Sequence, residues 1–145
     1  MSNSRMGTYV PLIQKFVAKA FLHHTAIAEQ LGLNASDLKA LQLLGGESLS
    51  PRELGEKIGL TGAAVTALID RLEQAGYAAR ERDNQDRRRV TVHAAPEKLR
   101  EIERLYAPQR RRMSRLLAQY SDEEFRTVAD FLTQATKMLG DDDRV

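Results

Sequence analysis

The chain has 145 residues, of which 42% are hydrophobic and 29% charged, and this composition indicates one globular domain with a core of its own. It contains no cysteine, which excludes a disulfide scaffold, a thiolate metal site and redox sensing by its own thiols. No apolar run approaches the roughly 18 residues of a membrane span, and lysines interrupt the apolar N-terminal segment. We therefore expect neither a membrane span nor a signal peptide, but a protein of the reducing cytoplasm.

The net charge of +2 is unevenly distributed along the chain. Residues 46–94 carry eight basic and eight acidic side chains, whereas residues 95–120 have a net charge of +4 and residues 121–145 a net charge of −4. A nucleic-acid partner must therefore be argued from where the arginines lie, because the bulk charge does not indicate one.

Two helices are expected first. Apolar residues at three-to-four spacing predict one long amphipathic helix over residues 9–31, which Gly32 ends. Asn34 and Asp37 have the spacing of a capping box and begin a second helix, which a pair of glycines ends.

The next segment has the pattern of a helix-turn-helix. Ser50 and Glu53 form a second capping box, and Gly59 closes this helix within roughly three turns. Thr61 is the N-cap of the following helix, over residues 61–75, which carries one apolar stripe. Two helices joined by so short a turn are typical of this motif.

A hairpin follows, where the apolar period changes from 3.6 to 2. Short strands at residues 77–82 and 89–94 flank the polar sequence DNQD, and together they predict a two-stranded wing. Its tip is unusual, because residues 80–89 hold five arginines and three acids. A hairpin needs no run of like charges to close, so either the turn is simply solvated or it meets a polyanion.

The chain then returns to helix. A heptad-like apolar seam begins near Pro96, and Pro108 is expected to kink or split that helix. Ser121 and Glu124 form a third capping box, which opens the last helix. The sequence therefore predicts a mainly α protein with a small β-hairpin, a winged helix-turn-helix.

The segment LGLTGAAVTALIDRLEQAGYAARERDNQDRRRVTV resembles the winged-helix core of the MarR family of bacterial transcriptional regulators. The resemblance implies a homodimer formed by the N- and C-terminal helices that binds a pseudo-palindromic operator in double-stranded DNA. It also implies release by a small phenolic or anionic effector. The expected domains are an N-terminal dimerisation helix (residues 1–34), a DNA-binding domain (35–95) and C-terminal dimerisation helices (96–145).

The resemblance places the helix over residues 61–75 in the major groove as the recognition helix. Ala67 stands where family members often carry a basic residue, so the helix has little hydrogen-bonding reach. Small side chains can touch thymine methyl groups, and Thr66 can bond a base or phosphate. The exposed front of this helix is expected to be Gly62, Ala63, Ala64, Thr66 and Ala67.

The wing, residues 82–89, is expected in the minor groove. By the resemblance Arg88 enters the groove, and Asp86 orients the neighbouring guanidinium group. Strand alternation would direct Arg87 and Arg89 to the other face or to phosphates. A narrow A·T-rich groove concentrates negative potential, which favours arginine. The alternative is a solvated turn with salt bridges inside the hairpin, each worth at most about 1 kcal/mol.

Further DNA contacts are expected at helix ends. The N-termini at Ser50 and Thr61 offer N–H groups to phosphates. Arg71 either reaches the DNA backbone or pairs on the helix surface with Asp70 or Glu73.

An effector site is expected from Phe16, Ala20, His24, Tyr106 and Arg112, with dimer core as the alternative role of the aromatic residues. The arginine run over residues 110–115 otherwise supplies surface charges that pair with the acidic last helix. The three histidines lack the spacing of a metal site, so no metal or other cofactor is expected.

No catalytic spacing, phosphate loop or metal motif indicates an enzyme. The function expected is a DNA-binding repressor released by an effector. Two alternatives remain open. One is an architectural protein that binds DNA without sequence preference, and the other is a helical protein-interaction module.

Overall fold

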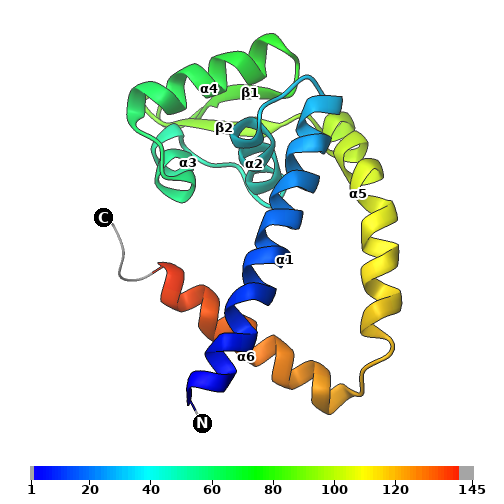
Figure 1. Cartoon of the computed structure of the whole chain (residues 1–145). Coiled ribbons are helices and arrows are strands. Elements are labelled where there is room, and N and C mark those ends of the chain that lie inside the picture. The colour runs from blue at the N-terminus through cyan, green and yellow to red at the C-terminus, as the bar shows by residue number, and fades with distance from the viewer. Residues whose placement is uncertain (1, 141–145) are drawn as a thin grey trace. The chain divides into compact units, whose positions relative to one another are not determined.

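The computed structural model describes residues 2–140, which form six helices and one two-stranded antiparallel hairpin (Figure 1). This confirms the predicted fold class. In chain order the elements are α1 (Ser2–Gln30), α2 (Ala35–Leu44), α3 (Pro51–Ile58), α4 (Gly62–Gln74), β1 (Ala78–Arg82), β2 (Val90–Ala94), α5 (Pro96–Leu117) and α6 (Asp122–Gly140).

The chain divides into two compact units, Met1–Leu105 and Tyr106–Val145. The first unit contains the elements from α1 to β2 and the beginning of α5. The second contains the remainder of α5 and α6. The division into residues 1–34, 35–95 and 96–145 stays a prediction.

Helix ends follow the predicted capping residues. The Asn34 side chain accepts the Asp37 N–H at 2.8 Å, and the Ser50 hydroxyl accepts the Glu53 N–H at 3.1 Å. Gly59 closes α3 with φ of +73°, a left-handed conformation that a side chain disfavours. These ends are local, because each bond joins residues three or four apart.

Helices α3 and α4 cross closely at Gly55. A Cβ atom at this position would lie 3.1 Å from Cγ2 of Val65 and 3.2 Å from the carbonyl oxygen of Leu60. The Leu60 N–H donates to the Gly55 carbonyl at 3.0 Å, which holds the turn between the helices. The absent side chain therefore lets the helix-turn-helix close.

The core of the first unit joins α2, α3, α4 and β2. Leu49 exchanges two backbone hydrogen bonds with Val92, so a third short extended segment lies beside β2. Each buried leucine contributes about 1.5–3 kcal/mol to folding. The largest fully buried side chains are Leu38, Leu41, Leu54, Leu68, Ile69, Leu72 and Val92.

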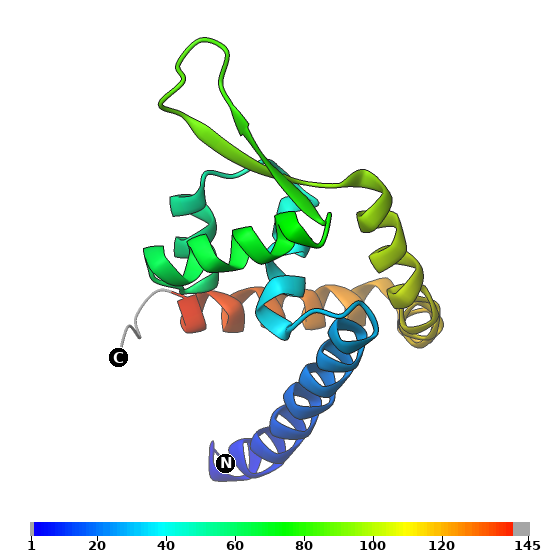
Figure 2. The same ribbon diagram turned by 90° about the horizontal axis from the view of Figure 1, so that it is seen from above.

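The hairpin extends away from this core. Ala78 lies opposite Ala94 and Arg82 lies opposite Val90. Figure 2 shows the two strands projecting beyond α3 and α4 and ending in a loop. The loop residues 83–89 are all exposed, so the hairpin carries its charged tip clear of the core.

Two sequence expectations were wrong in detail. Helix α1 begins at Ser2, before the predicted residue 9, because the periodicity of apolar residues cannot mark a polar first turn. Helix α5 runs unbroken through Pro108, so the predicted split does not occur. A proline removes one N–H bond, and here the bonds on either side continue the helix.

Candidate nucleic-acid interface

Helix α4 has one buried and one exposed side. Its buried stripe is Val65, Leu68, Ile69 and Leu72, at the three-to-four spacing that places residues on one helix face. The predicted front residues lie on the opposite side, where Ala64 is half-buried and the others are exposed: Gly62, Ala63, Thr66 and Ala67. The side chains on this side are short and include few polar groups.

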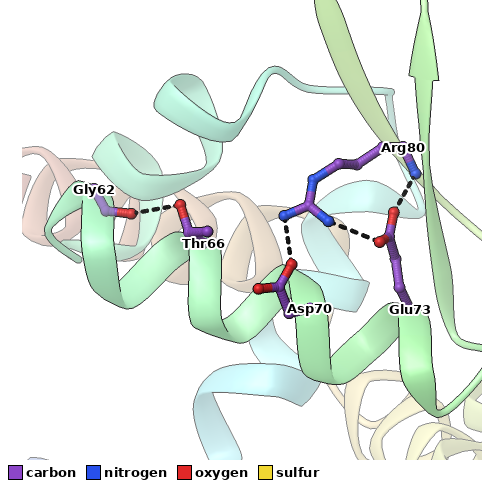
Figure 3. A network of polar contacts seen from close by, with 5 residues as sticks. All are labelled: Gly62, Thr66, Asp70, Glu73 and Arg80. Atoms are coloured by element: carbon purple, nitrogen blue, oxygen red, sulfur yellow. Dashed lines mark hydrogen bonds and ion pairs between the residues drawn. The ribbon is translucent and has the colours of Figure 1, made fainter.

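The one hydroxyl on that surface is engaged within the helix. The Thr66 hydroxyl donates to the Gly62 carbonyl at 2.9 Å (Figure 3). Its oxygen can still accept a hydrogen bond, for example from a base amino group. Donation to a phosphate would require this bond to break, because a hydroxyl has one proton.

The wing tip forms a turn of its own. The Asp86 carboxylate accepts the Arg88 N–H at 3.0 Å, and the Asp86 carbonyl accepts the Arg89 N–H at 2.9 Å. Asp86 therefore holds the backbone of the turn, and that it orients a neighbouring guanidinium group stays a prediction. Because β2 begins only at Val90, strand alternation does not direct Arg87 and Arg89.

The tip arginines are exposed and differ in their surroundings. Among residues 2–140, the guanidinium groups of Arg87 and Arg88 make no ion pair or hydrogen bond. The alternative for this turn was a solvated loop with salt bridges inside the hairpin. These two side chains take no part in such salt bridges. The positive charge of Arg89 helps to lower the pKa of Glu53, at the start of α3.

A broad groove separates the wing from the N-terminus of α3. Ser50 and Arg52 line one side, and Arg88 and Arg89 line the other. The N-terminus itself is capped by an acid, since the Glu53 carboxylate accepts the Ser50 N–H at 2.8 Å. This backbone hydrogen bond is the main cause that lowers the pKa of Glu53. The Ser50 N–H is thereby used, as the predicted capping box implies, and a phosphate would have to compete with Glu53 for it.

Arg71 binds a partner that the sequence did not indicate. Its Nη2 lies 2.8 Å from Oδ1 of Asp37, whose side chain is only 5% exposed. The expected partners Asp70 and Glu73 instead bind Arg80, a residue absent from the predicted site. The sequence held no signal for either pairing, because the partners lie up to 34 residues apart.

Arg80, on β1, connects the hairpin to α4 (Figure 3). Its Nη2 donates to Asp70 at 2.8 Å and its Nη1 to Glu73 at 2.7 Å. Its backbone N–H donates to the second oxygen of Glu73 at 2.7 Å. Strand and helix are thus joined by both main-chain and side-chain bonds.

The predicted effector residues fall in both units. Phe16, Ala20 and His24 lie on α1, whereas Tyr106 and Arg112 lie in the part of α5 that belongs to the second unit. Their assembly into one pocket stays a prediction.

Of the predicted effector residues, His24 lines a hollow of about 330 Å³ in the first unit. Its Nε2 lies 3.0 Å from the carbonyl oxygen of Ala35. The other residues that line this hollow come from three helices and were not predicted from the sequence: Phe21, Ala35, Ser36, Lys39, Gln42 and Ile58.

Two further properties concern the described part of the chain. Within residues 2–140 no group of three or more histidine or acidic side chains could hold a metal ion. None of the helices there is long and apolar enough to span a membrane.

Comparison with known proteins gives one family. A family model described as "MarR family" matches residues 31–89. The chain is 38% identical over 133 residues to the HTH-type transcriptional regulator YcgE of Bacillus subtilis (strain 168), and the match spans 91% of this chain and 86% of that protein.

Solved structures show the same architecture. A MarR family protein from Bacillus stearothermophilus matches with a TM-score of 0.76 and 25% identity, over 96% of this chain and 98% of that one. A point mutant of MepR from S. aureus, solved bound to an oligodeoxyribonucleotide, matches with a TM-score of 0.63 and 22% identity, over 90% of this chain and 97% of that one.

Proposed function

The chain belongs to the MarR family of helix-turn-helix transcriptional regulators, and on that premise we propose that it binds a pseudo-palindromic operator as a homodimeric repressor. In this proposal α4 occupies the major groove of double-stranded DNA, and the wing (residues 82–89) enters the flanking minor groove. The half-sites then lie roughly 34–36 Å apart on one face of the duplex.

The observation that carries the proposal is the state of the wing tip. Arg87 and Arg88 are exposed at the end of a projecting hairpin, and no acidic side chain among residues 2–140 neutralises them. Exposed guanidinium groups that form no ion pair within the protein do not stabilise its fold. A minor groove supplies the negative potential that they lack.

The front of α4 suits close approach more than hydrogen-bonded readout. The methyl groups of Ala63 and Ala67 can touch thymine methyl groups, and Gly62 lets the backbone come close, but none of these side chains carries a donor or acceptor. Thr66 offers an accepting oxygen. The operator's groove width and deformability therefore supply much of the specificity, through the wing.

The homodimer is supported by two apolar sides of α1. Residues advance by about 100° around a helix, so Ile13, Val17 and Phe21 share one side, while Leu12 and Phe16 share another. Phe16, Val17 and Phe21 are 59%, 57% and 60% exposed. A helix that is apolar on two sides needs apolar neighbours on both, and a second copy supplies one of them.

The second unit exposes similar side chains, on α6: Phe125, Val128, Phe131 and Leu132. These residues join α1 in the proposed dimer interface.

The effector proposed is a small aromatic anion. The hollow beside His24 has the size of such a molecule at about 330 Å³, with Phe21 as an apolar wall and Lys39 as a cation. Lys39→Met should weaken binding of an aromatic carboxylate, measured by calorimetry with salicylate as the probe. Unchanged affinity for salicylate, or no binding by either protein, would exclude this hollow as its site.

The decisive test is fluorescence anisotropy on the DNA upstream of the protein's own gene and on a scrambled duplex, across a salt series. A regulator should prefer its site by about 10³-fold or more. Arg88→Ala should weaken site-specific binding by about tenfold, with a loss near 1.4 kcal/mol. Arg100→Ala on α5 is the matched control, because it removes an exposed positive charge outside the wing.

Each outcome separates two candidate functions. Equal binding to both duplexes would favour an architectural protein, a role compatible with the small side chains on α4. Loss of affinity from Arg100→Ala as large as that from Arg88→Ala would mean that total charge, and not the wing, governs binding.

A further inference from the structure

Arg80 lies where the recognition helix and the wing are joined. Its three hydrogen bonds reach two carboxylates on successive turns of α4, those of Asp70 and Glu73 (Figure 3). Because the acids stand three residues apart on one helix face, they meet the two terminal nitrogens of a single guanidinium group. The two carboxylates therefore fix the position of β1 along the axis of α4, and they also hold β1 close to the helix surface.

The network is partly shielded from water. The side chains of Arg80 and Glu73 are 30% and 32% exposed, whereas the Arg52–Glu56 pair on α3 is 86% and 58% exposed. The hydrogen bond to Asp70, followed by the charge of Glu73, raises the pKa of Arg80. An ion pair with ordered partners and reduced solvent contact is stronger than an ordinary surface pair.

The buried Tyr77, whose N–H donates to the Leu72 carbonyl at 2.8 Å, holds the start of the hairpin against α4, but beyond it β1 itself contributes little apolar packing. Ala78 is the one buried residue of β1, and its side chain is a single methyl group. Residues 83–89 of the tip are exposed throughout, so the backbone of the strands alone determines where the tip arginines point. A small rotation of β1 at Arg80 is therefore magnified at the tip.

The network also alters the charge next to the proposed DNA surface. Asp70 is 53% exposed on α4 and would repel a phosphate backbone if it stood alone. Arg80 binds it and leaves its own terminal nitrogens engaged by carboxylates. Arg80 is thus occupied within the protein, unlike Arg87 and Arg88.

We propose that Arg80 is a positioning residue that sets the angle between α4 and the wing, so that helix and wing reach neighbouring grooves together. The inference rests on the proposed function, since it assigns Arg80 an effect on DNA binding exerted through Arg88. Arg80 itself does not touch the DNA.

The first experiment is a double-mutant cycle with Arg88→Ala, read by operator anisotropy. Arg80→Met keeps the aliphatic stem and removes the fork, and we expect it to weaken operator binding by about tenfold. Arg88→Ala should then cost less than about threefold in the Arg80→Met background, against about tenfold in the wild type. Arg80→Lys, which keeps the charge but not the planar fork, should behave like Arg80→Met. Equal losses from Arg88→Ala in both backgrounds would overturn the positioning role.

The second experiment needs no DNA. Because the chain has no cysteine, spin labels can be placed at Ala63→Cys on α4 and Asn84→Cys on the wing tip. Labelled chains are diluted with unlabelled chains so that distances within one chain dominate. The distance distribution should be narrow with Arg80 present and broad in Arg80→Met, whereas Arg100→Met should leave it narrow. A distribution unchanged by Arg80→Met would sink the inference.

Asp70→Asn is the second variant, for the case in which Arg80→Met does not fold. It removes the negative charge of one of the two partners and should broaden the same distribution, with circular dichroism confirming the fold. The two experiments distinguish a failure of the proposed function from a failure of the role proposed for Arg80. Absence of operator preference in the wild type contradicts the proposed function, whereas the label distances judge Arg80 whether or not DNA binds.

Discussion

The carboxylate of Asp37 joins two helices of the DNA-binding unit. Its Oδ1 lies 2.8 Å from Nη2 of Arg71 on α4, while its Oδ2 accepts the Asn34 N–H at the start of α2 at 3.4 Å. With 3% of its surface exposed, Asp37 is the one buried charged residue among those described. A single carboxylate thereby caps α2 and anchors the recognition helix to it.

Removing Arg71 should cost more stability than an ordinary surface change. Arg71→Met leaves the buried carboxylate of Asp37 without its cation, and we expect a loss of about 2 kcal/mol. This is below the range for fully buried pairs, because the Arg71 side chain is 50% exposed. Urea denaturation at fixed protein concentration measures it, since a dimer's stability depends on concentration.

The control for Arg71 is Arg100→Met, which removes an exposed cation and should change stability by less than about 0.5 kcal/mol. Adding Asp37→Asn to Arg71→Met should restore part of the loss, since the buried charge is then gone. An additive double variant would contradict the pairing.

Gly55→Ala should destabilise the helix-turn-helix by about 1–3 kcal/mol. The new methyl group would lie 3.1 Å from Cγ2 of Val65 and 3.2 Å from the Leu60 carbonyl oxygen, so these atoms would have to move apart by a few tenths of an ångström. Thermal denaturation compares it with Gly62→Ala, where a Cβ meets nothing within 4 Å. Alanine favours a helix more than glycine does, so Gly62→Ala should not lower the melting temperature. Equal effects of the two changes would refute a tight crossing.

The Ser50–Glu53 capping box should make stability depend on pH. The pKa of Glu53 is lowered from the ordinary 4.5, chiefly by the backbone hydrogen bond from Ser50. A lowered native pKa means that this contribution is complete above pH 4.5 and is lost as the pH falls through the native value. Glu53→Gln should therefore be less stable than the wild type at neutral pH, and the difference should shrink in acid.

Urea midpoints measured from about pH 7 to about pH 3 test this dependence. Glu29→Gln, which neutralises an exposed acid of α1, serves as the control and should show no such convergence. A difference between Glu53→Gln and the wild type that stays constant across the series would show that the cap carboxylate makes no charge-dependent contribution.

The proposed dimer should dissociate when a charge is placed on the apolar side of α1. Val17→Asp puts a carboxylate beside Ile13 and Phe21, and its desolvation opposes burial against a second copy. Sedimentation equilibrium should show a loss of association of about tenfold or more. Lys19→Asp, at an exposed polar position of the same helix, is the matched control. A wild-type protein that sediments as a monomer would contradict the proposed dimer.

The predictability of the fold follows from the range of its interactions. The ends of α2, α3 and α4 were predicted correctly from Asn34, Ser50 and Thr61, because an N-cap side chain bonds a backbone N–H two or three residues away. The wing was predicted from alternation and a polar turn. The unbroken course of α5 was not predicted, because the one N–H bond that Pro108 removes does not outweigh the helical bonds around it.

The candidate site was predicted less completely, for a physical reason that its arginines illustrate. Five of them lie within residues 80–89, and the sequence marked the group without separating their roles. Arg80 is enclosed by Asp70 and Glu73, whereas Arg88 extends into solvent. An arginine's long side chain can reach partners on several elements, so its role depends on which acids packing brings near.

The sequence alone thus determined the order of the helices, the N-terminal ends of α2, α3 and α4, and the hairpin, since these depend on neighbouring residues and on apolar period. The family followed from the resemblance of its winged-helix segment to known sequences. Only the tertiary structure decided that Asp37 binds Arg71 and that Arg80 joins the wing to α4. Ion pairs and hydrogen bonds act over about 3 Å. Partners far apart in the chain reach that distance only after the core has packed.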